Sequence, residues 1–494
     1  MSIFKACDIR GVYGRDLTEE TIHRIGRAMG TLIGPKTVVV GGDVRLSTPS
    51  LKAALMSGLG ESGARVIDIG IVPTPAFYFA KDHLNADAGA MVTASHNPPE
   101  HNGLKLVLGS LPITDEELRT VRDLCEKGEF TAEAGDVREV NILPSYISFI
   151  HRIAPPRHKR STSVCRGQDR ESRRASEESS VDFGIRAESK AGDDAHSSTI
   201  ILDCGNGCYS ELAPGVLRDF GYRVEELFCT PDGGFPNRHP NSAVAEHLHE
   251  LRRRVVAEGA DLGIAFDGDG DRVSFVDDKG RFLSSDKAII ILSRHILADN
   301  PNQKVVHDLK CSSVVAESVS QAGGVPVPER SGHAFIKARM ISEDAAFGGE
   351  VSGHYFYREL HGGDDGLYTA LVMADILSGS GRKLSEISDA VPEYVTTPDI
   401  RIPFDGDREQ IIERIASRFA PEEVSRLDGV KINFGDGWGL ARVSVTEPAI
   451  TLRFEAVSEN RLREIVGQFL DPVPEIRRSS EGRGILRGRS DAEA

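Results

Sequence analysis

The stretch Thr93-Ala94-Ser95-His96-Asn97-Pro98 follows the apolar run Ala90-Met91-Val92, which is typical of the end of a buried strand. Asn97, Pro98 and Pro99 force the chain out of regular structure there, because proline fixes φ and restricts the residue before it. The Ser95 hydroxyl is then exposed at the rim of a sheet. Ten residues later Lys105 stands among apolar neighbours, which is costly unless its ammonium faces a site. We hypothesise that Ser95 carries chemistry and that Lys105 works beside it. An ordinary surface turn with an edge lysine fits these residues about as well.

The composition limits the class of protein. A chain of 494 residues suggests three or four domains, and 39% hydrophobic residues supply several cores. A high glycine content of 50 with few aromatic residues fits an α/β protein with many tight turns. The formal net charge of −16 argues against nucleic acid or an anionic membrane as a partner. An anionic ligand therefore needs positive charge that is concentrated locally.

The cysteines and the apolar runs indicate the compartment. The seven cysteines are scattered and form no CxxC pair, which argues against a disulfide framework or a zinc site and for a reducing compartment. The N-terminus has no long apolar segment, and no later run approaches the roughly 20 apolar residues that span a bilayer. We predict a soluble, cytoplasmic protein.

Helix and strand signals alternate along most of the chain. β-branched runs at 37–40 and 65–69 end in glycine turns, and amphipathic segments such as 18–32, with Thr18 as N-cap, lie between them. This alternation predicts α/β domains with mixed, mostly parallel sheets, whose ligands bind beyond the carboxyl ends of the strands. From about residue 395 the pattern changes to that of a smaller α+β domain. We predict four domains: 1–150, 198–281, 282–394 and 395–474.

Two segments lack the pattern of a folded domain. Residues 155–197 are rich in Ser, Arg, Glu and Asp with almost no apolar periodicity, so they bury too little surface to offset the entropy of ordering. Residues 475–494 have a similar composition. We predict a disordered, dispensable insertion between the first two domains and a disordered C-terminal tail.

Three aspartates follow the apolar strand 261–266 at a spacing of two: Asp267, Asp269 and Asp271. Alternate side chains of an extended segment share a face, so the three carboxylates can converge on one cation. Hard oxygen ligands with open positions suit Mg²⁺. An EF-hand loop also begins D-x-D-x-D, but Arg272 replaces its sixth-position glycine and Asp278 its final glutamate. A solvated acidic turn would leave three like charges close together without a cation.

Two further stretches repeat this alternation of polar side chains. The first joins an acid, a hydroxyl and an imidazole between glycines, which suits sugar hydroxyls. The second joins a guanidinium and two hydroxyls, which suits a phosphate. Each stretch taken alone fits a capped turn or a strand edge as well. The residues are Glu350, Ser352 and His354 in the first and Arg442, Ser444 and Thr446 in the second.

Taken together, these motifs resemble those of the α-D-phosphohexomutase superfamily over nearly the whole chain outside the two low-complexity segments. TASHNP around Ser95 is similar to its phosphorylated-serine motif, and FKACDIRG at 4–11 to the N-terminal motif that brings Arg10 into the site. DGDGDR at 267–272 is similar to its metal loop, and RVSVTEP at 442–448 to its phosphate loop. GEVSGH at 349–354 looks most like the sugar loop of the phosphomannomutase/phosphoglucomutase branch.

The resemblance implies an enzyme that interconverts mannose (or glucose) 6-phosphate and 1-phosphate. The phosphoryl group would pass through Ser95 and a hexose 1,6-bisphosphate, with Mg²⁺ held by Ser95 and the three aspartates. Arg10 and Arg272 would offset charge, while Lys105, with a pKa lowered by nearby cations, and His96 would serve as acid and base. The resemblance also implies that the four domains surround a central cleft, which a hinge near residue 395 would open and close. The implied substrate contacts are the residues of the two polar stretches together with Lys310 and His333.

The resemblance leaves alternatives open. One is phosphoglucosamine mutase of the same superfamily, although that branch usually has a glutamine where Val351 stands. Others are a non-catalytic sugar-phosphate sensor that kept the fold and a phosphatase that loses its phosphoryl group to water. Intact Ser95, Lys105 and aspartates argue against the sensor. The expected partners are small sugar phosphates, and a monomer and a dimer fit equally well.

Overall fold

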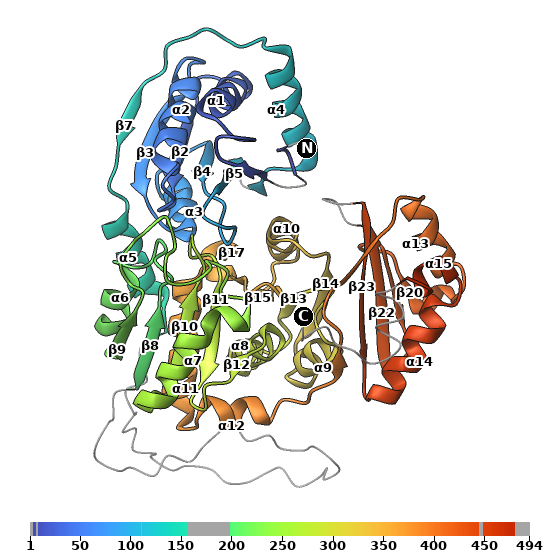
Figure 1. Ribbon diagram of the computed structural model, residues 1–494. Coiled ribbons are helices and arrows are strands. Elements are labelled where there is room, and N and C mark those ends of the chain that lie inside the picture. The colour runs from blue at the N-terminus through green and yellow to red at the C-terminus, as the bar shows by residue number, and fades with distance from the viewer. Residues whose placement is uncertain (1–2, 6–7, 110, 156–197, 444–447, 480–494) are drawn as a thin grey trace, which may run out of the picture.

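The computed structural model describes residues 3–5, 8–109, 111–155, 198–443 and 448–479 (Figure 1). These residues form four units in chain order, each built on its own sheet. Units I, II and III have mixed sheets covered by helices, whereas unit IV has an antiparallel sheet and stands to the right of unit III in Figure 1. The predicted class, three α/β units followed by a smaller α+β unit, is confirmed.

Unit I carries the serine stretch. Its sheet has the order β1-β5-β4-β2-β3-β7, with β6 paired to β5, and α1 begins after the predicted N-cap Thr18. Its strands are β1 Ile9–Val12, β2 Thr37–Gly42, β3 Arg65–Ile71, β4 Ala88–Val92, β5 His101–Leu108, β6 Leu111–Pro112 and β7 Val137–Glu139. Its helices are α1 Glu19–Ile33, α2 Thr48–Gly60, α3 Thr74–His83, α4 Asp115–Lys127 and α5 Leu143–Ile153.

Unit II carries the aspartate stretch. Its sheet has the order β12-β11-β10-β8-β9, and the aspartates follow β10, whose five residues are all buried. Its strands are β8 Thr199–Asp203, β9 Arg223–Leu227, β10 Leu262–Phe266, β11 Val273–Asp277 and β12 Phe282–Leu283. Its helices are α6 Ala213–Asp219, the 3₁₀ helix η1 Ala245–Leu248 and α7 His249–Glu258.

Unit III repeats this plan, with the sheet order β14-β13-β15-β16-β17. Its strands are β13 Lys304–Asp308, β14 Val325–Glu329, β15 Phe347–Gly349, β16 Tyr355–Tyr357 and β17 Gly363–Asp364. Its helices are α8 Ser285–Asp299, α9 Ser313–Gln321, α10 His333–Glu343, the 3₁₀ helix η2 Arg358–Leu360, α11 Gly366–Ser380 and α12 Leu384–Asp389.

Unit IV is built on antiparallel strands in the order β18-β23-β22-β21-β20, with β19 also paired to β23. Its apolar core is separate from those of the other units. Its strands are β18 Val395–Thr396, β19 Ile400–Pro403, β20 Val424–Ser425, β21 Val430–Asn433, β22 Gly437–Val443 and β23 Ala449–Ala456. Its helices are α13 Arg408–Ala416, the 3₁₀ helix η3 Pro421–Glu423, α14 Glu459–Leu470 and α15 Pro474–Arg477.

Parallel pairing is confined to one side of each mixed sheet, a smaller share than the alternation of helices and strands predicts. In unit I, β4 runs parallel to β2 but antiparallel to β5. The cause is the serine stretch itself, since the chain turns back after Ser95 without the crossover helix that a parallel connection requires. This turn brings Lys105 of β5 beside Met91 of β4.

Unit I is joined to the next two units through α5. The Tyr146 hydroxyl lies 2.8 Å from that of Tyr209 in unit II and donates to Asp365 Oδ2 in unit III at 2.6 Å. A single apolar cluster runs through α3, α5 and the cores of units II and III. The predicted domain boundary at residue 150 therefore falls inside a helix that packs on the following units.

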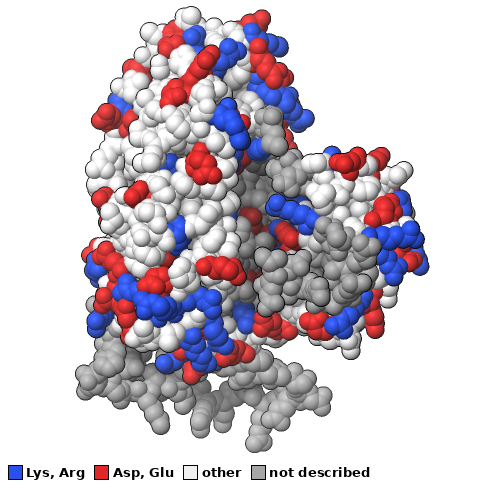
Figure 2. Space-filling view, in the orientation of Figure 1, with Lys and Arg blue, Asp and Glu red and all other residues white. Residues whose placement is uncertain are grey.

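The predicted disordered segments lie mostly outside the described residues, since 156–197 and 480–494 are not described. The tail predicted for 475–494 begins too early, because α15 continues to Arg477 and Ile476 is 1% exposed against the core of unit IV. Among the helices of the described residues, none combines the length and apolarity that a membrane crossing requires. Acidic and basic side chains are interspersed over the face drawn in Figure 2.

Candidate active site

The serine stretch forms a tight loop after β4. Ser95 is 1% exposed and has φ of 51°, a left-handed conformation that is uncommon for a residue with a side chain. Its backbone N–H donates to Thr93 Oγ1 at 2.9 Å, which stabilises the turn. A strained, buried backbone at the end of a strand is typical of a functional position.

Arg45 supports this loop through hydrogen bonds to its backbone carbonyls. It is buried, and its guanidinium donates to the Ser95 carbonyl at 2.8 Å and to those of Asn97 and Pro98 at 2.6 Å each. Asp43 balances its charge at 3.0 Å. Sequence reasoning missed this role. The signal was Asp43-Val44-Arg45 directly after β2, the strand next to β4.

The aspartate loop of unit II meets the serine loop of unit I directly. The Ser95 hydroxyl donates to Asp267 Oδ2 at 2.8 Å, although the two residues lie 172 positions apart. Gly268 makes this approach possible, because a Cβ at that position would stand 2.6 Å from the Ser95 carbonyl oxygen. The two stretches singled out from the sequence therefore form one site, which we call the serine–aspartate cluster: Ser95, Lys105, Asp267, Asp269 and Asp271.

Lys105 faces this cluster, as its apolar surroundings predicted. Its ammonium donates to Asp269 Oδ2 at 2.7 Å and also to Asp271 Oδ2. Burial alone would lower the pKa of Lys105, but the carboxylates of Asp269 and Asp271 raise it well above the usual range. The lowered pKa predicted for Lys105 presupposes a Mg²⁺ ion beside it and stays a prediction, whereas the nearest protein groups are acids and act in the opposite direction.

The three aspartates fit a divalent cation. One carboxylate oxygen from each lies within 4.8 Å of the others, and all three residues are buried. Asp269 Oδ1 and Asp271 Oδ1 have no hydrogen-bond partner among the described residues. Burial and the two neighbouring carboxylates raise the pKa of Asp267 to about 8. Buried acids with free oxygens gain from a cation that takes hard oxygen ligands, such as Mg²⁺.

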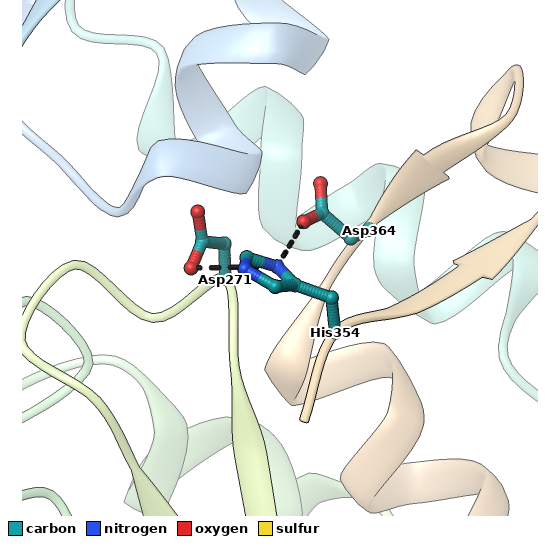
Figure 3. A group of neighbouring side chains, drawn as sticks. All are labelled: Asp271, His354 and Asp364. Carbon is teal, nitrogen blue, oxygen red and sulfur yellow. Dashed lines mark hydrogen bonds and ion pairs between the residues drawn. The ribbon is translucent and has the colours of Figure 1, made fainter. Parts of the chain in front are cut away.

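A histidine of unit III closes the other side of the aspartates. His354 Nδ1 lies 2.5 Å from Asp364 Oδ2 and 3.7 Å from Asp271 Oδ1 (Figure 3). Its Nε2 accepts from Arg272 Nε at 2.9 Å. Asp364 thus orients the imidazole, and sequence reasoning missed it. The only indication of this role is the position of Asp364 on the short strand β17, close to the predicted sugar-binding stretch at 350–354.

His96 and Arg10 flank the serine. His96 Nδ1 lies 3.3 Å from the Ser95 hydroxyl, and burial together with Arg272 and Arg10 lowers the pKa of His96 well below its usual value. Arg10 donates to the Ala94 carbonyl at 3.1 Å and to Asn97 Oδ1 at 2.5 Å. Both predicted residues therefore lie at the serine loop.

The predicted sugar-binding stretch, Glu350, Ser352 and His354, adjoins the serine–aspartate cluster, and His354 is the residue that makes the contact. The Glu350 backbone N–H donates to the His354 carbonyl at 3.0 Å. Glu350 Oε2 and Ser352 Oγ are buried atoms without a hydrogen-bond partner among the described residues, so they have capacity for ligand hydroxyls. The His333 ring stacks on that of His354, with centroids 5.7 Å apart.

Two of the predicted substrate contacts form ion pairs with aspartates outside this cluster. Arg442, at the end of β22, forms an ion pair with Asp428 at 2.9 Å. Lys310 Nζ pairs with Asp399 Oδ2 at 2.9 Å across the junction of units III and IV. Ser444 and Thr446 lie outside the described residues.

The arrangement defines a class of protein. Four models of the phosphoglucomutase/phosphomannomutase domains match in chain order: domain I at residues 1–132, domain II at 180–280, domain III at 284–394 and the C-terminal domain at 400–471. Together they cover most of the chain. The chain belongs to the phosphoglucomutase/phosphomannomutase family, within the α-D-phosphohexomutase superfamily that its motifs resemble.

Individual relatives agree with this assignment. The phosphomannomutase/phosphoglucomutase of Pseudomonas aeruginosa PAO1 is 36% identical over 482 residues, 96% of each chain. The phosphomannomutase of Escherichia coli K12 is 35% identical over 478 residues, covering 94% of this chain and 97% of that one. A crystal structure of a phosphoglucomutase/phosphomannomutase family protein from Burkholderia thailandensis superposes with a TM-score of 0.83, at 31% identity over 97% of this chain and 98% of that one.

Proposed function

We propose that the protein interconverts the 1-phosphate and 6-phosphate of mannose or glucose, with Ser95 as the group that carries the phosphoryl. The observation that supports this most is the contact of the Ser95 hydroxyl with Asp267 at 2.8 Å, beside a lysine held on the other two aspartates. A serine hydroxyl among three buried acids is suited to a phosphoryl group only when cations offset the charge. Lys105, Arg10 and Arg272 supply part of that positive charge.

The reaction proceeds in two transfers. The bond between phosphorus and Ser95 Oγ breaks as a free hydroxyl of the bound hexose monophosphate attacks the phosphorus, which gives a hexose 1,6-bisphosphate and free Ser95. The bisphosphate then presents its other phosphate, and Ser95 Oγ attacks it to regenerate the phosphoserine and release the isomer. Positioning and charge neutralisation are the main demands of such a transfer.

Protons move in the opposite sense to the phosphoryl group. The attacking hydroxyl loses a proton and the leaving oxygen gains one, so the site needs groups that face both oxygens. His96 Nδ1 lies 3.3 Å from Ser95 Oγ, and the Lys105 ammonium donates to Asp269 Oδ2 at 2.7 Å. We assign the acid and base roles to these two residues.

Asp267, Asp269, Asp271 and Ser95 would hold a Mg²⁺ ion. Bound there, the ion supplies positive charge against the phosphoserine and the developing charge of the transfer. The protein's own part is to keep the carboxylates fixed. Thr74, Thr93 and Lys105 donate to Asp269 Oδ2 at 2.7, 3.1 and 2.7 Å, and Lys105 also donates to Asp271 Oδ2. Asp267 Oδ1 accepts from the backbone N–H groups of Gly270 and Arg272 at 3.0 and 3.2 Å.

Residues of units III and IV would contact the opposite end of the substrate. The unpartnered oxygens of Glu350 and Ser352 are suited to sugar hydroxyls. Arg442 offers a guanidinium to the phosphate that is not reacting. Because the bisphosphate must present each end to Ser95 in turn, these contacts must accept the sugar in two orientations.

The test is a coupled assay with both epimers. Purified protein, Mg²⁺ and a trace of glucose 1,6-bisphosphate are given glucose 1-phosphate or mannose 1-phosphate, and the 6-phosphate and free phosphate are both measured. We expect 6-phosphate without free phosphate. Free phosphate in equal amount indicates a phosphatase, and no turnover of either epimer, with tight binding retained, indicates a sensor. Turnover of glucosamine 1-phosphate in preference to both epimers contradicts the proposed substrate class.

A further inference from the structure

A cavity lies outside the set of residues assigned to the reaction. It has a volume of about 440 Å³ and lies between α3 of unit I and α10 and η2 of unit III. This volume is within the range of small-molecule sites, roughly 300–1,000 Å³. Its walls include Tyr78, Val107, Lys337, Met340, Ile341 and Arg358. Neither the sequence motifs nor the proposed mechanism uses this cavity.

Lys337 is the unusual residue of the cavity. It is only 9% exposed, and its Nζ lies 4.2 Å from the centroid of the Tyr78 ring. Among the residues that the structure describes, none accepts a hydrogen bond from this ammonium, and no carboxylate lies within 4.0 Å of it. Burial lowers the pKa of Lys337, while Asp364 and Asp82 act on it only through space. A buried ammonium with three donors and one aromatic neighbour lacks acceptors.

The other cations of the cavity already have partners. Lys81 pairs with Asp82 at 3.3 Å. Arg358 donates to Gln303 Oε1 at 2.7 Å and pairs with Asp344 at 3.2 Å. Lys337 is therefore the cation of this wall whose donors are available to a ligand.

We propose that this cavity binds a small organic anion, with one carboxylate or phosphate group on the Lys337 ammonium and an apolar body against Met340 and Ile341. Met340 is buried and Ile341 is 45% exposed, so together they form an apolar wall that runs from the interior to the surface. A charged hydrogen bond to a buried ammonium is among the stronger polar contacts, and the aliphatic wall favours an apolar ligand body.

The ligand would bridge two units beside the reaction site. Tyr78 belongs to unit I and Lys337 to unit III, so an occupant contacts both. Tyr78 also lies near Lys105: burial raises the pKa of Tyr78, and the Lys105 ammonium opposes this rise. The cavity is nevertheless reached from the surface side of Ile341, and its anchor is not part of the serine–aspartate cluster.

Calorimetric titration of the full-length protein with benzoate and with phenyl phosphate tests the proposal, with benzyl alcohol as the neutral probe. We expect at least one anion to bind about tenfold or more tightly than benzyl alcohol, and the stronger of the two identifies the head group. Lys337→Met should weaken that binding about tenfold or more, since it keeps the length of the side chain and removes the charge. Lys81→Met, the matched control, should leave binding within about twofold because Lys81 is already paired.

A second variant protects the test against misfolding. Ile341→Trp retains Lys337 but fills the outer part of the cavity, so it should also abolish binding while the melting temperature stays near that of the wild type. Arg442→Ala should leave this binding unchanged. The proposal is overturned if neither anion binds the wild type, if binding persists in both Lys337→Met and Ile341→Trp, or if Arg442→Ala removes it instead.

Discussion

The two ends of the proposed substrate site are held in different ways. At the serine–aspartate cluster, loops from units I and II touch through the Ser95–Asp267 contact at 2.8 Å, and Thr74, Thr93 and Lys105 of unit I all donate to Asp269 of unit II. Every residue of this cluster is at most 3% exposed. The chemical groups are thus fixed before any ligand arrives.

Arg442 and its partner Asp428 lie in unit IV, and we call them the arginine end of the site. Unit IV is joined to unit III by a few contacts. Lys310 pairs with Asp399, the Ser313 N–H donates to Glu455 Oε1 at 2.9 Å, and Lys431 donates to the Leu309 carbonyl at 2.7 Å. Unit IV also has its own apolar core. This difference fits the proposed function, in which charge neutralisation is preorganised for phosphoryl transfer, whereas the proposed contact with the distant phosphate has to release when the bisphosphate reorients.

The largest effect is expected at the serine. Ser95→Ala removes the proposed phosphoryl carrier, so kcat should fall by about 10⁴-fold or more in the coupled assay while the melting temperature stays close to that of the wild type. Ser50→Ala, an exposed serine of the same unit, should retain full activity. Near-normal turnover by Ser95→Ala would show that Ser95 does not carry the phosphoryl group and that the serine–aspartate cluster is not the reacting end of the site.

Metal removal should come next. Chelation should abolish turnover, and added Mg²⁺ should restore it in the wild type. Asp267→Asn should lower kcat by roughly 10²–10³-fold and lose the rise in melting temperature that Mg²⁺ gives the wild type. Asp219→Asn, an exposed acid of unit II, is the control. Full activity in the presence of a chelator would contradict the assignment of the three aspartates.

The arginine end should respond in a different kinetic parameter. Arg442→Ala should raise KM by about 10–100-fold and change kcat only a few-fold, because the proposed function places the guanidinium on a phosphate that does not react. Arg426→Ala also removes an arginine of unit IV, one that pairs with Glu413, and should leave both parameters unchanged. A fall in kcat with KM unaltered would mean that the two ends are not separable.

The smallest effect is expected from the pH dependence of stability that His307 causes, at the junction of units III and IV. His307 of β13 is 7% exposed, and burial lowers its pKa from 6.5 to about 4. The unfolded chain binds the proton more readily, so the stability that neutral His307 contributes is present above pH 6.5 and is lost as pH falls toward 4. Between pH 7 and pH 5 the wild type should lose about 2 kcal/mol relative to His307→Gln.

Denaturant unfolding of both proteins across this pH range measures the difference, followed by the fluorescence of Trp438, the single tryptophan, which packs with Leu309 at the junction. Parallel pH profiles for wild type and variant would show that His307 is not buried in its neutral form.

Much of the site was readable from short-range pattern. The aspartates alternate within one strand exit, and the serine follows a buried strand directly, so periodicity and turn chemistry identified both. The same rules found Lys105, because a lysine in an apolar run is conspicuous. They missed Arg45 and Asp364, whose roles depend on which loops lie above them rather than on their own neighbours in sequence.

The order of the strands was less predictable than their existence. Local signals gave β2, β3 and β4 correctly, but the antiparallel return of β5 depends on the length of one turn. The direct contact of Lys105 with two carboxylates, which raise its pKa, was not predicted for a related reason. These carboxylates come from another unit, and the fold places them on Lys105.

The sequence by itself determined the four α/β and α+β units, the family and most of the residues that meet at the serine, because strand periodicity, turn residues and spaced acids are local properties of the chain. Only the tertiary structure decided that Ser95 contacts Asp267, that Arg45 supports its loop, that Asp364 orients His354 and that Lys337 faces a second cavity. These contacts join residues from different units, and long-range packing, not local preference, sets the distances between them.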